Sequence, residues 1–138
     1  MRAVLDPNVL ISALLSPRGA PAQIVSQWRA GAFELVVSDL VVVELQRALG
    51  YPKLRDRVSP EEAAELVELL RAASHLADDP VVVPRRSPDA GDDYLIALAE
   101  ADRAILVSGD RHILGLAGTF PIRTPTEFLA TLGDEPSR

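Results

Sequence analysis

The chain has 138 residues, a length that fits one domain, since domains cluster at roughly 100–150 residues. It contains no cysteine, which excludes disulfides, zinc–thiolate sites and thiol nucleophiles. Its net charge of −6 argues against a broad basic surface for polyanions, although an acidic site can approach phosphate groups through metal ions. No apolar stretch approaches the roughly 20 residues that span a bilayer, and no secretory pattern is present, so we expect a cytoplasmic protein without membrane association.

Short apolar runs alternate with helical patterns in the first half of the chain. In chain order, the expected elements are a strand at Arg2–Leu5, a loop or short helical turn at 7–19, a helix at about 21–29, a strand at Phe33–Val37 and a helix from Ser38 or Asp39 to Leu49. The next helix has the clearest start, because Ser59, Pro60 and Glu62 form a capping box with proline at the first helical position.

The second half continues the same alternation. We expect, in order, a buried third strand at Val81–Val83, a polar loop at 84–91, a helix at about 92–101, a fourth strand at Ala104–Val107, a short helix after His112, a fifth strand at 121–123 and a last helix after Thr124. Alternating strands and helices predict an α/β fold with a mostly parallel sheet covered on both faces. Residues 1–132 are interpreted as one domain and 133–138 as a polar tail.

Two carboxylates follow expected strands. Asp6 ends the first strand, and Asp110 comes shortly after the fourth. In an open α/β sheet, ligands bind where the carboxyl ends of the strands face a crevice, and the first and fourth strands can be neighbours there. Each residue alone is also explained by a turn or a helix cap.

Further carboxylates belong to helices. Glu44 shares a helical stripe with apolar residues, where a charge is costly unless it is paired or turned towards water. Asp92 and Asp93 open a helix, and capping explains one of them more easily than both. Clustered carboxylates repel one another unless divalent cations lie among them, and hard oxygen ligands favour Mg²⁺ or Mn²⁺. This pattern indicates metal-assisted phosphodiester hydrolysis.

Four motifs occur in a characteristic order: Val4-Leu-Asp6-Pro-Asn8, Val43-Glu44-Leu, Asp92-Asp93-Tyr-Leu-Ile-Ala-Leu-Ala and Leu106-Val-Ser-Gly-Asp110. This order resembles the PIN-domain family, notably the VapC-like toxins of type II toxin–antitoxin systems. The resemblance implies a three-layer α/β/α sandwich with a five-stranded parallel sheet in the order 3-2-1-4-5. It also implies a Mg²⁺- or Mn²⁺-dependent ribonuclease, often a homodimer, that acts on RNA and is inhibited by a cognate antitoxin.

By motif match, the catalytic and metal-binding positions are Asp6, Glu44, Asp93 and Asp110. Asp93 is preferred to Asp92 because it precedes the Ile96-Ala97 pair by three residues. The supporting residues are Asn8, Ser108 and Asp92, and the candidate RNA contacts are Arg85, Arg86 and Arg111. Solvated loop charge is the simpler interpretation of these arginines.

Two positions depart from the family pattern. Pro7 stands where Thr or Ser is usual, which removes a hydroxyl and an N–H donor beside the site. His112 replaces a frequent second acid and is interpreted as a helix start. The alternative to a nuclease is therefore a catalytically impaired PIN-fold module that binds RNA or protein. A phosphotransferase or receiver is disfavoured, because Asn8 stands where a second Asp is needed and no late Lys is present.

Overall fold

The computed structural model describes residues 1–88 and 90–134, and its centre is a five-stranded sheet in the order β3-β2-β1-β4-β5. The strands are β1 (Arg2–Leu5), β2 (Glu34–Val37), β3 (His75–Leu76), β4 (Ile105–Val107) and β5 (Ile122–Arg123). Every neighbouring pair is parallel. The expected fold class and strand order are thus confirmed.

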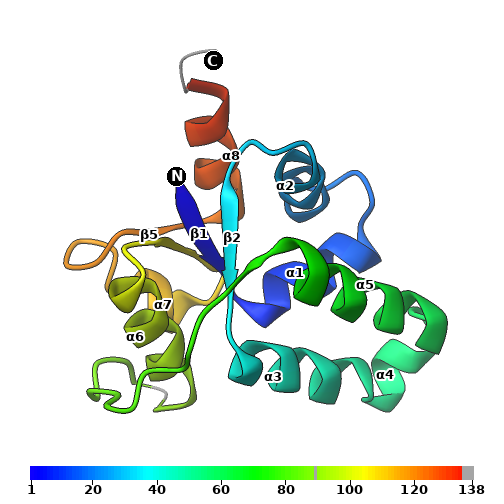
Figure 1. Ribbon diagram of the computed structural model, residues 1–138, viewed down its shortest axis with the longest axis horizontal. Helices are drawn as coiled ribbons and strands as arrows, with labels where there is room; N and C mark the ends of the chain where they lie inside the picture. Colours follow the sequence, from blue (N-terminus) through cyan, green and yellow to red (C-terminus); the bar gives the residue numbers. More distant parts are fainter. Residues whose placement is uncertain (89, 135–138) are drawn as a thin grey trace.

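Helices cover both faces of this sheet. They are α1 (Pro7–Leu15), α2 (Ala20–Arg29), α3 (Asp39–Leu49), α4 (Pro52–Arg55), α5 (Pro60–Ala73), α6 (Asp93–Ala101), α7 (Arg111–Leu114) and α8 (Pro125–Asp134), with a 3₁₀ turn at Ala90–Asp92. Figure 1 shows α6 and α7 on one side of the central strands and α1, α3 and α5 on the other. Within the described ranges, none of the helices has the length and apolar character needed to cross a membrane.

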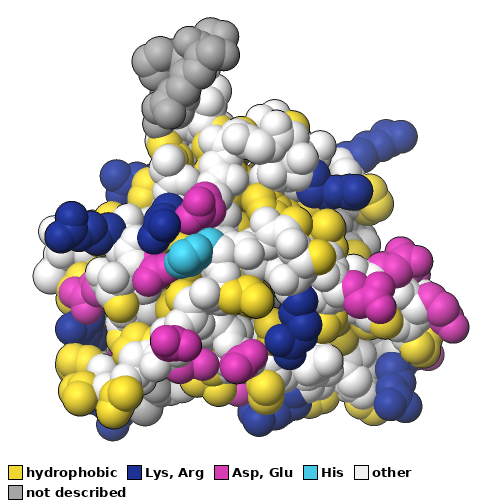
Figure 2. All heavy atoms as spheres, in the orientation of Figure 1, with side chains coloured by type: hydrophobic (Ala, Val, Ile, Leu, Met, Phe, Trp, Pro, Cys, Tyr) yellow, Lys and Arg dark blue, Asp and Glu magenta, His cyan; other side chains and the backbone are white. Residues whose placement is uncertain are grey.

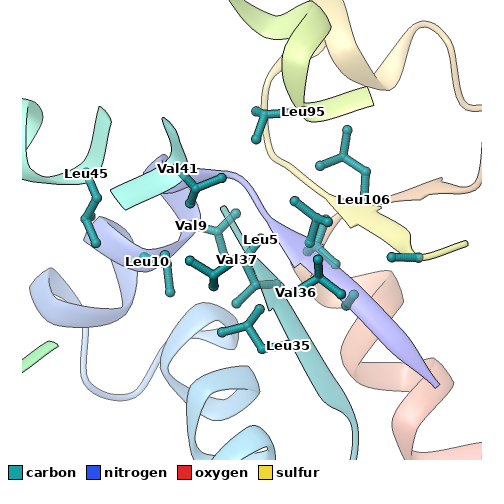
Figure 3. Packing of buried hydrophobic residues seen from close by; sticks show 14 of the residues in the cluster. Leu5, Val9, Leu10, Leu35, Val36, Val37, Val41, Leu45, Leu95 and Leu106 are labelled. Atoms are coloured by element: carbon teal, nitrogen blue, oxygen red, sulfur yellow. The ribbon is translucent and has the colours of Figure 1, made fainter. Parts of the chain in front are cut away.

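The core is built on the two central strands. Leu5 of β1 and Val37 of β2 are almost fully buried and lie beside Val9 and Leu10 of α1 (Figure 3). Leu106 of β4 is equally buried. Continuous apolar strands of this kind are typical of a parallel sheet that is covered on both faces. The core therefore fixes the carboxyl ends of β1 and β4 side by side.

The segment after β1 is more regular than expected. Residues 7–15 form the helix α1 instead of a loop or a short turn. Asp6 caps this helix, Pro7 occupies the first helical position, and Val9, Leu10 and Ile11 are buried against the core. Proline is well placed at a helix start because the N–H that it lacks would have no intrahelical partner.

The expected third strand at Val81–Val83 is wrong. These residues are exposed, Val81 completely, and β3 is instead His75–Leu76, which pairs with Val36 and Val37 of β2. Pro80 and Pro84 flank the valine run, and proline cannot donate to a strand ladder. The chain reaches the sheet edge directly after α5 and has left it before the valines.

The predicted capping box at Ser59 is confirmed, and a second one starts the last helix. Ser59 and Glu62 exchange side-chain-to-backbone hydrogen bonds at the start of α5, and Thr124 and Glu127 do so before α8. The helix α8 continues to Asp134, so two residues assigned to the polar tail are helical. The rest of that expected tail, 135–138, lies outside the described residues.

Candidate active site

The site is organised by the pairing of β1 with β4. Leu5 pairs with Val107, and the N–H of Asp6 donates to the carbonyl of Val107 over 3.0 Å. The residues that follow the two strands therefore start from adjacent positions at the same edge of the sheet. This arrangement is the one that the sequence predicted for Asp6 and Asp110.

Ser108 links the two strand ends. Its hydroxyl donates to Oδ2 of Asp6 over 2.8 Å and accepts the N–H of Asp110 over 3.0 Å. The other oxygen of Asp6, Oδ1, accepts the N–H of Asn8 over 3.0 Å. Asn8 thus supports Asp6 through its backbone, and Ser108 orients the Asp6 carboxylate.

Asp110 has a second role as a helix cap. Its Oδ1 accepts the N–H groups of His112 and Ile113 over 2.7 and 3.3 Å, which starts α7. The side chain of His112 is exposed. The interpretation of His112 as part of a helix start agrees with this geometry.

Asp6 is an energetically costly carboxylate. It is only 5% exposed, and burial raises the pKa of its carboxyl above the ordinary value. The hydrogen bonds from Asn8 and Ser108 act in the opposite direction, while the negative charge of Asp110 raises the pKa further. The two carboxylates therefore lie close enough to repel each other, as expected for a site that attracts a cation.

Tyr94 on α6 lies among the acidic side chains. Burial raises the pKa of its hydroxyl above the ordinary value, and the charges of Glu44, Asp6, Asp79 and Asp92 raise it further. The ring of Tyr94 is packed partly against the core. These four carboxylates come from α3, from the end of β1, from the loop after β3 and from the turn before α6. Figure 2 shows acidic side chains gathered between α3 and that loop.

Glu44 reaches this region from α3. Its carboxylate is about one-third exposed and pairs with Arg47 on the same helix over 3.1 Å. The alternative that Glu44 turns towards water therefore holds in part. Its charge nevertheless acts on Tyr94, which places it on the acidic side of the molecule.

The structure separates Asp92 from Asp93. The Oδ1 of Asp93 accepts the N–H groups of Ser87 and Arg86 over 2.8 and 3.2 Å, and Asp93 is buried. It thereby holds the polar loop against the start of α6. Asp92 is half-buried and is the member of the pair whose charge raises the pKa of Tyr94.

Sequence reasoning missed Asp79. Its Oδ2 accepts the N–H of Leu40 over 3.1 Å and so caps α3 from a distant part of the chain. Its Oδ1 is buried and has no hydrogen-bond partner within residues 1–88 and 90–134. The only local signal is the pair Asp78-Asp79 before Pro80, which does not identify the helix that it caps.

The candidate RNA-contact arginines differ in whether their side chains are paired with other residues or exposed. The guanidinium of Arg86 bonds to Glu100 and lies 5.0 Å from the ring centroid of Phe120, so it is held on the outer face of α6. Arg85 and Arg111 are exposed. The side chains of these two residues are therefore better placed than that of Arg86 to contact a polyanion.

The donor chemistry fits a hard divalent cation. Among the described residues no three acidic or histidine side chains converge as a complete protein-held metal site. Mg²⁺ does not require such a cage, because it keeps several waters and is usually bound by one or two carboxylates together with substrate phosphates. Asp6 is buried and Asp110 is half-buried, and their negative charges repel each other. These two carboxylates supply that minimal set.

Comparison with known proteins gives a family and a fold. The PIN domain family model matches residues 2–112. Uncharacterized protein MJ1680 of Methanocaldococcus jannaschii is 27% identical over 124 residues, which cover 84% of this chain and 75% of that protein.

Solved structures have the same fold. PAE2754 from Pyrobaculum aerophilum gives a TM-score of 0.67 at 20% identity, covering 98% of this chain and 91% of that one. VapBC2 from Rickettsia felis, solved with a DNA fragment from its promoter, gives a TM-score of 0.62 at 13% identity, covering 90% of this chain and 98% of that one. VapBC-1 from nontypeable Haemophilus influenzae gives a TM-score of 0.59 at 18% identity, covering 91% of this chain and 99% of that one. These structures show the fold, and the family-model match, which spans most of the sequence, shows that this chain belongs to the PIN domain family.

Proposed function

We propose that this protein is a Mg²⁺- or Mn²⁺-dependent endoribonuclease and the toxin of a toxin–antitoxin pair. The observation that carries the proposal is the Asp6–Ser108–Asp110 arrangement, in which one hydroxyl donates to the carboxylate of Asp6 and accepts the backbone N–H of Asp110 at the ends of adjacent parallel strands. PIN domains are generally nucleases that use divalent metal ions. An acidic chain with a carboxylate site at this edge of the sheet suits such a nuclease.

Asp6 and Asp110 are the proposed metal ligands. When bound there, the cation would activate water and offset the negative charge of the phosphodiester. Asp6 keeps its orientation through Ser108 and the N–H of Asn8, and Asp110 through the start of α7. These bonds fix both carboxylates before substrate arrives, so little rearrangement is needed for binding.

Glu44 and Asp93 complete the proposed acidic set, with Asp92 in support. Asp93 uses one oxygen to hold the polar loop, which leaves its Oδ2 as the oxygen proposed to face the site. Exposed Arg85 and Arg111 are proposed to meet RNA phosphates, in preference to Arg86, which pairs with Glu100.

A cognate antitoxin is the proposed partner. Two of the similar structures are those of VapBC2 and VapBC-1, which are 13% and 18% identical to this chain. We propose by analogy a cytoplasmic homodimer that is held inactive by an antitoxin. Size-exclusion chromatography with light scattering, with and without the product of an adjacent short reading frame, tests both assemblies.

The experiment that tests the activity is cleavage of end-labelled single-stranded RNA by the purified protein. We expect fragments in millimolar Mn²⁺ or Mg²⁺ and intact RNA in EDTA. Intact RNA under every metal condition would contradict the nuclease proposal.

Pro7 motivates a second candidate function. It occupies the first position of α1 directly beside Asp6, where the family usually has Thr or Ser. Without that hydroxyl the protein would bind RNA or its partner with little cleavage. Pro7→Thr separates the two cases, because an impaired enzyme gains activity from the restored hydroxyl and a competent one does not.

A further inference from the structure

A cavity of about 300 Å³ opens directly beside the proposed metal ligands. It is formed where the start of α1 meets the first residues of α2 and α8 and the loop after β4. Asn8 and Asp110 belong both to this cavity and to the acidic site. A larger cavity of about 530 Å³ lies between α3 and α5 and has no acidic residue in its lining. The smaller cavity is therefore the one connected to the chemistry.

The lining of the smaller cavity combines apolar surfaces with neutral polar groups. Val9, Pro21 and Pro125 supply the apolar part. Ser12 supplies a hydroxyl and Asn8 an amide, both on exposed side chains that make no hydrogen bond to another described residue. These groups remain available to a ligand.

The charge of the lining selects the class of ligand. Asp110 is its one charged residue and is already assigned to the cation that would meet the phosphate, so the rest of the lining is left for a neutral group. A flat neutral ring with apolar faces and polar edges matches the lining, and a nucleobase has this character. Ligand pockets range from about 300 to 1,000 Å³, so this cavity is at the lower limit and suits one ring system.

Gly109 is part of the cavity lining. A Cβ added at this position would meet no atom within 4 Å, and its backbone does not have the left-handed φ that favours glycine. A side chain at 109 would therefore enter open space beside the cavity without strain. Gly118 has the same open surroundings but lies outside the cavity lining, which makes it a matched control.

We propose that this cavity binds one unpaired base of the RNA strand next to the phosphate that is cleaved, with Ser12 and Asn8 hydrogen-bonding to the base edge. The proposal rests on the proposed nuclease function and adds a subsite for one base beside the metal ligands. A base held in a duplex is stacked and paired and cannot enter such a cavity. Ser12 and Asn8 then set which base is preferred.

The first test needs no cleavage. Backbone amide NMR spectra of the protein are recorded with adenosine, guanosine, cytidine and uridine added separately at millimolar concentration. We expect one nucleoside to shift the amides of Asn8, Ser12 and Gly109 most strongly. Gly109→Val should abolish these shifts, and Gly118→Val should keep them. Absence of shifts with all four nucleosides, or shifts that persist in Gly109→Val, would overturn the proposal even if the protein cleaves RNA.

The second test maps cleavage positions in a mixed-sequence RNA. We expect a base preference at a fixed offset from the cut, and Ser12→Ala should weaken it by roughly 2–10-fold, the effect of losing one neutral hydrogen bond. Ser26→Ala, which changes an exposed serine outside the lining, should leave the preference intact. An unchanged preference in both Ser12→Ala and Gly109→Val refutes base recognition here. If the wild-type protein cuts no RNA, the nuclease proposal fails, and the nucleoside titration alone decides whether the cavity binds a base.

Discussion

The hydroxyl of Ser108 donates a 2.8 Å hydrogen bond to Oδ2 of Asp6 and so connects residues 102 positions apart in the sequence. Ser108 is fully buried and also accepts the N–H of Asp110. One small side chain therefore fixes the relative positions of both proposed metal ligands.

Replacing Ser108 with Ala should destabilise the fold and lower cleavage together. The change leaves a buried carboxylate oxygen and the N–H of Asp110 without their partner, at a cost of about 1–3 kcal/mol. Urea denaturation measures the loss, and Ser108→Thr, which keeps the hydroxyl, should retain more of both properties. Wild-type stability and activity in Ser108→Ala would show that the bridge is unimportant.

Asp6 should make stability depend on pH in an unusual direction for a carboxylate. Its pKa is raised in the folded state above the ordinary value of 3.8, so the folded protein holds this proton more tightly than the unfolded chain. This contribution to stability is present at low pH and is lost as pH rises through the raised folded pKa. Without metal, the melting temperature of Asp6→Asn relative to wild type should therefore rise from about pH 4 to neutral pH, because only the wild type loses this contribution.

Thermal melts in EDTA between about pH 4 and 8 measure that difference. Asn preserves the cap of α1, because its amide oxygen still accepts the N–H of Asn8. The same change replaces the acceptor of the Ser108 hydroxyl by an N–H donor and lowers stability equally at every pH. A difference between variant and wild type that stays constant from about pH 4 to 8 would contradict the predicted cost of the buried charge.

Asp92 and Asp93 should have separable effects. Asp93→Ala removes the acceptor of two backbone N–H groups and should cost about 1–3 kcal/mol, whereas Asp93→Asn keeps an acceptor oxygen and should lower cleavage with a smaller loss of stability. Asp92→Asn should leave most of the activity. If Asp92→Asn loses activity and Asp93→Asn does not, Asp92 and not Asp93 is the carboxylate that contributes to cleavage.

Asp79 should stabilise the start of α3. Asp79→Ala removes the acceptor for the N–H of Leu40, and the loss of a helix cap costs about 0.5–2 kcal/mol. Asp78→Ala, which changes the exposed neighbouring acid, serves as the control. Equal stabilities for the two variants, measured by urea denaturation, would exclude a capping role.

The sequence was sufficient for the parts of the fold that depend on local signals and ordered motifs. The capping box at Ser59 predicted a helix start, and the strand-end positions of Asp6 and Asp110 predicted their proximity. The strand order followed from the family resemblance. These features are encoded in short stretches, so no tertiary contact is needed to recognise them.

Features that depend on distant contacts could not be predicted. The run Val81–Val83 has strong strand propensity, yet the sheet edge is occupied by His75–Leu76, since propensity does not determine which segment reaches the edge. The cap on Leu40 comes from Asp79, and no local pattern joins them. The effect of four carboxylates on Tyr94 likewise arises only when the end of β1, α3, α6 and the loop before α6 are assembled.

The central claim is that Asp6 and Asp110 carry out metal-dependent RNA hydrolysis, and the rates of two isosteric variants test it most directly. In saturating Mn²⁺ with single-stranded RNA, Asp6→Asn and Asp110→Asn should each slow cleavage by about 100-fold or more, the scale of removing a preorganised electrostatic group. Asp56→Asn, which changes an exposed acid after α4, should cleave at the wild-type rate. Cleavage at that rate by both Asp6→Asn and Asp110→Asn would contradict the proposed site.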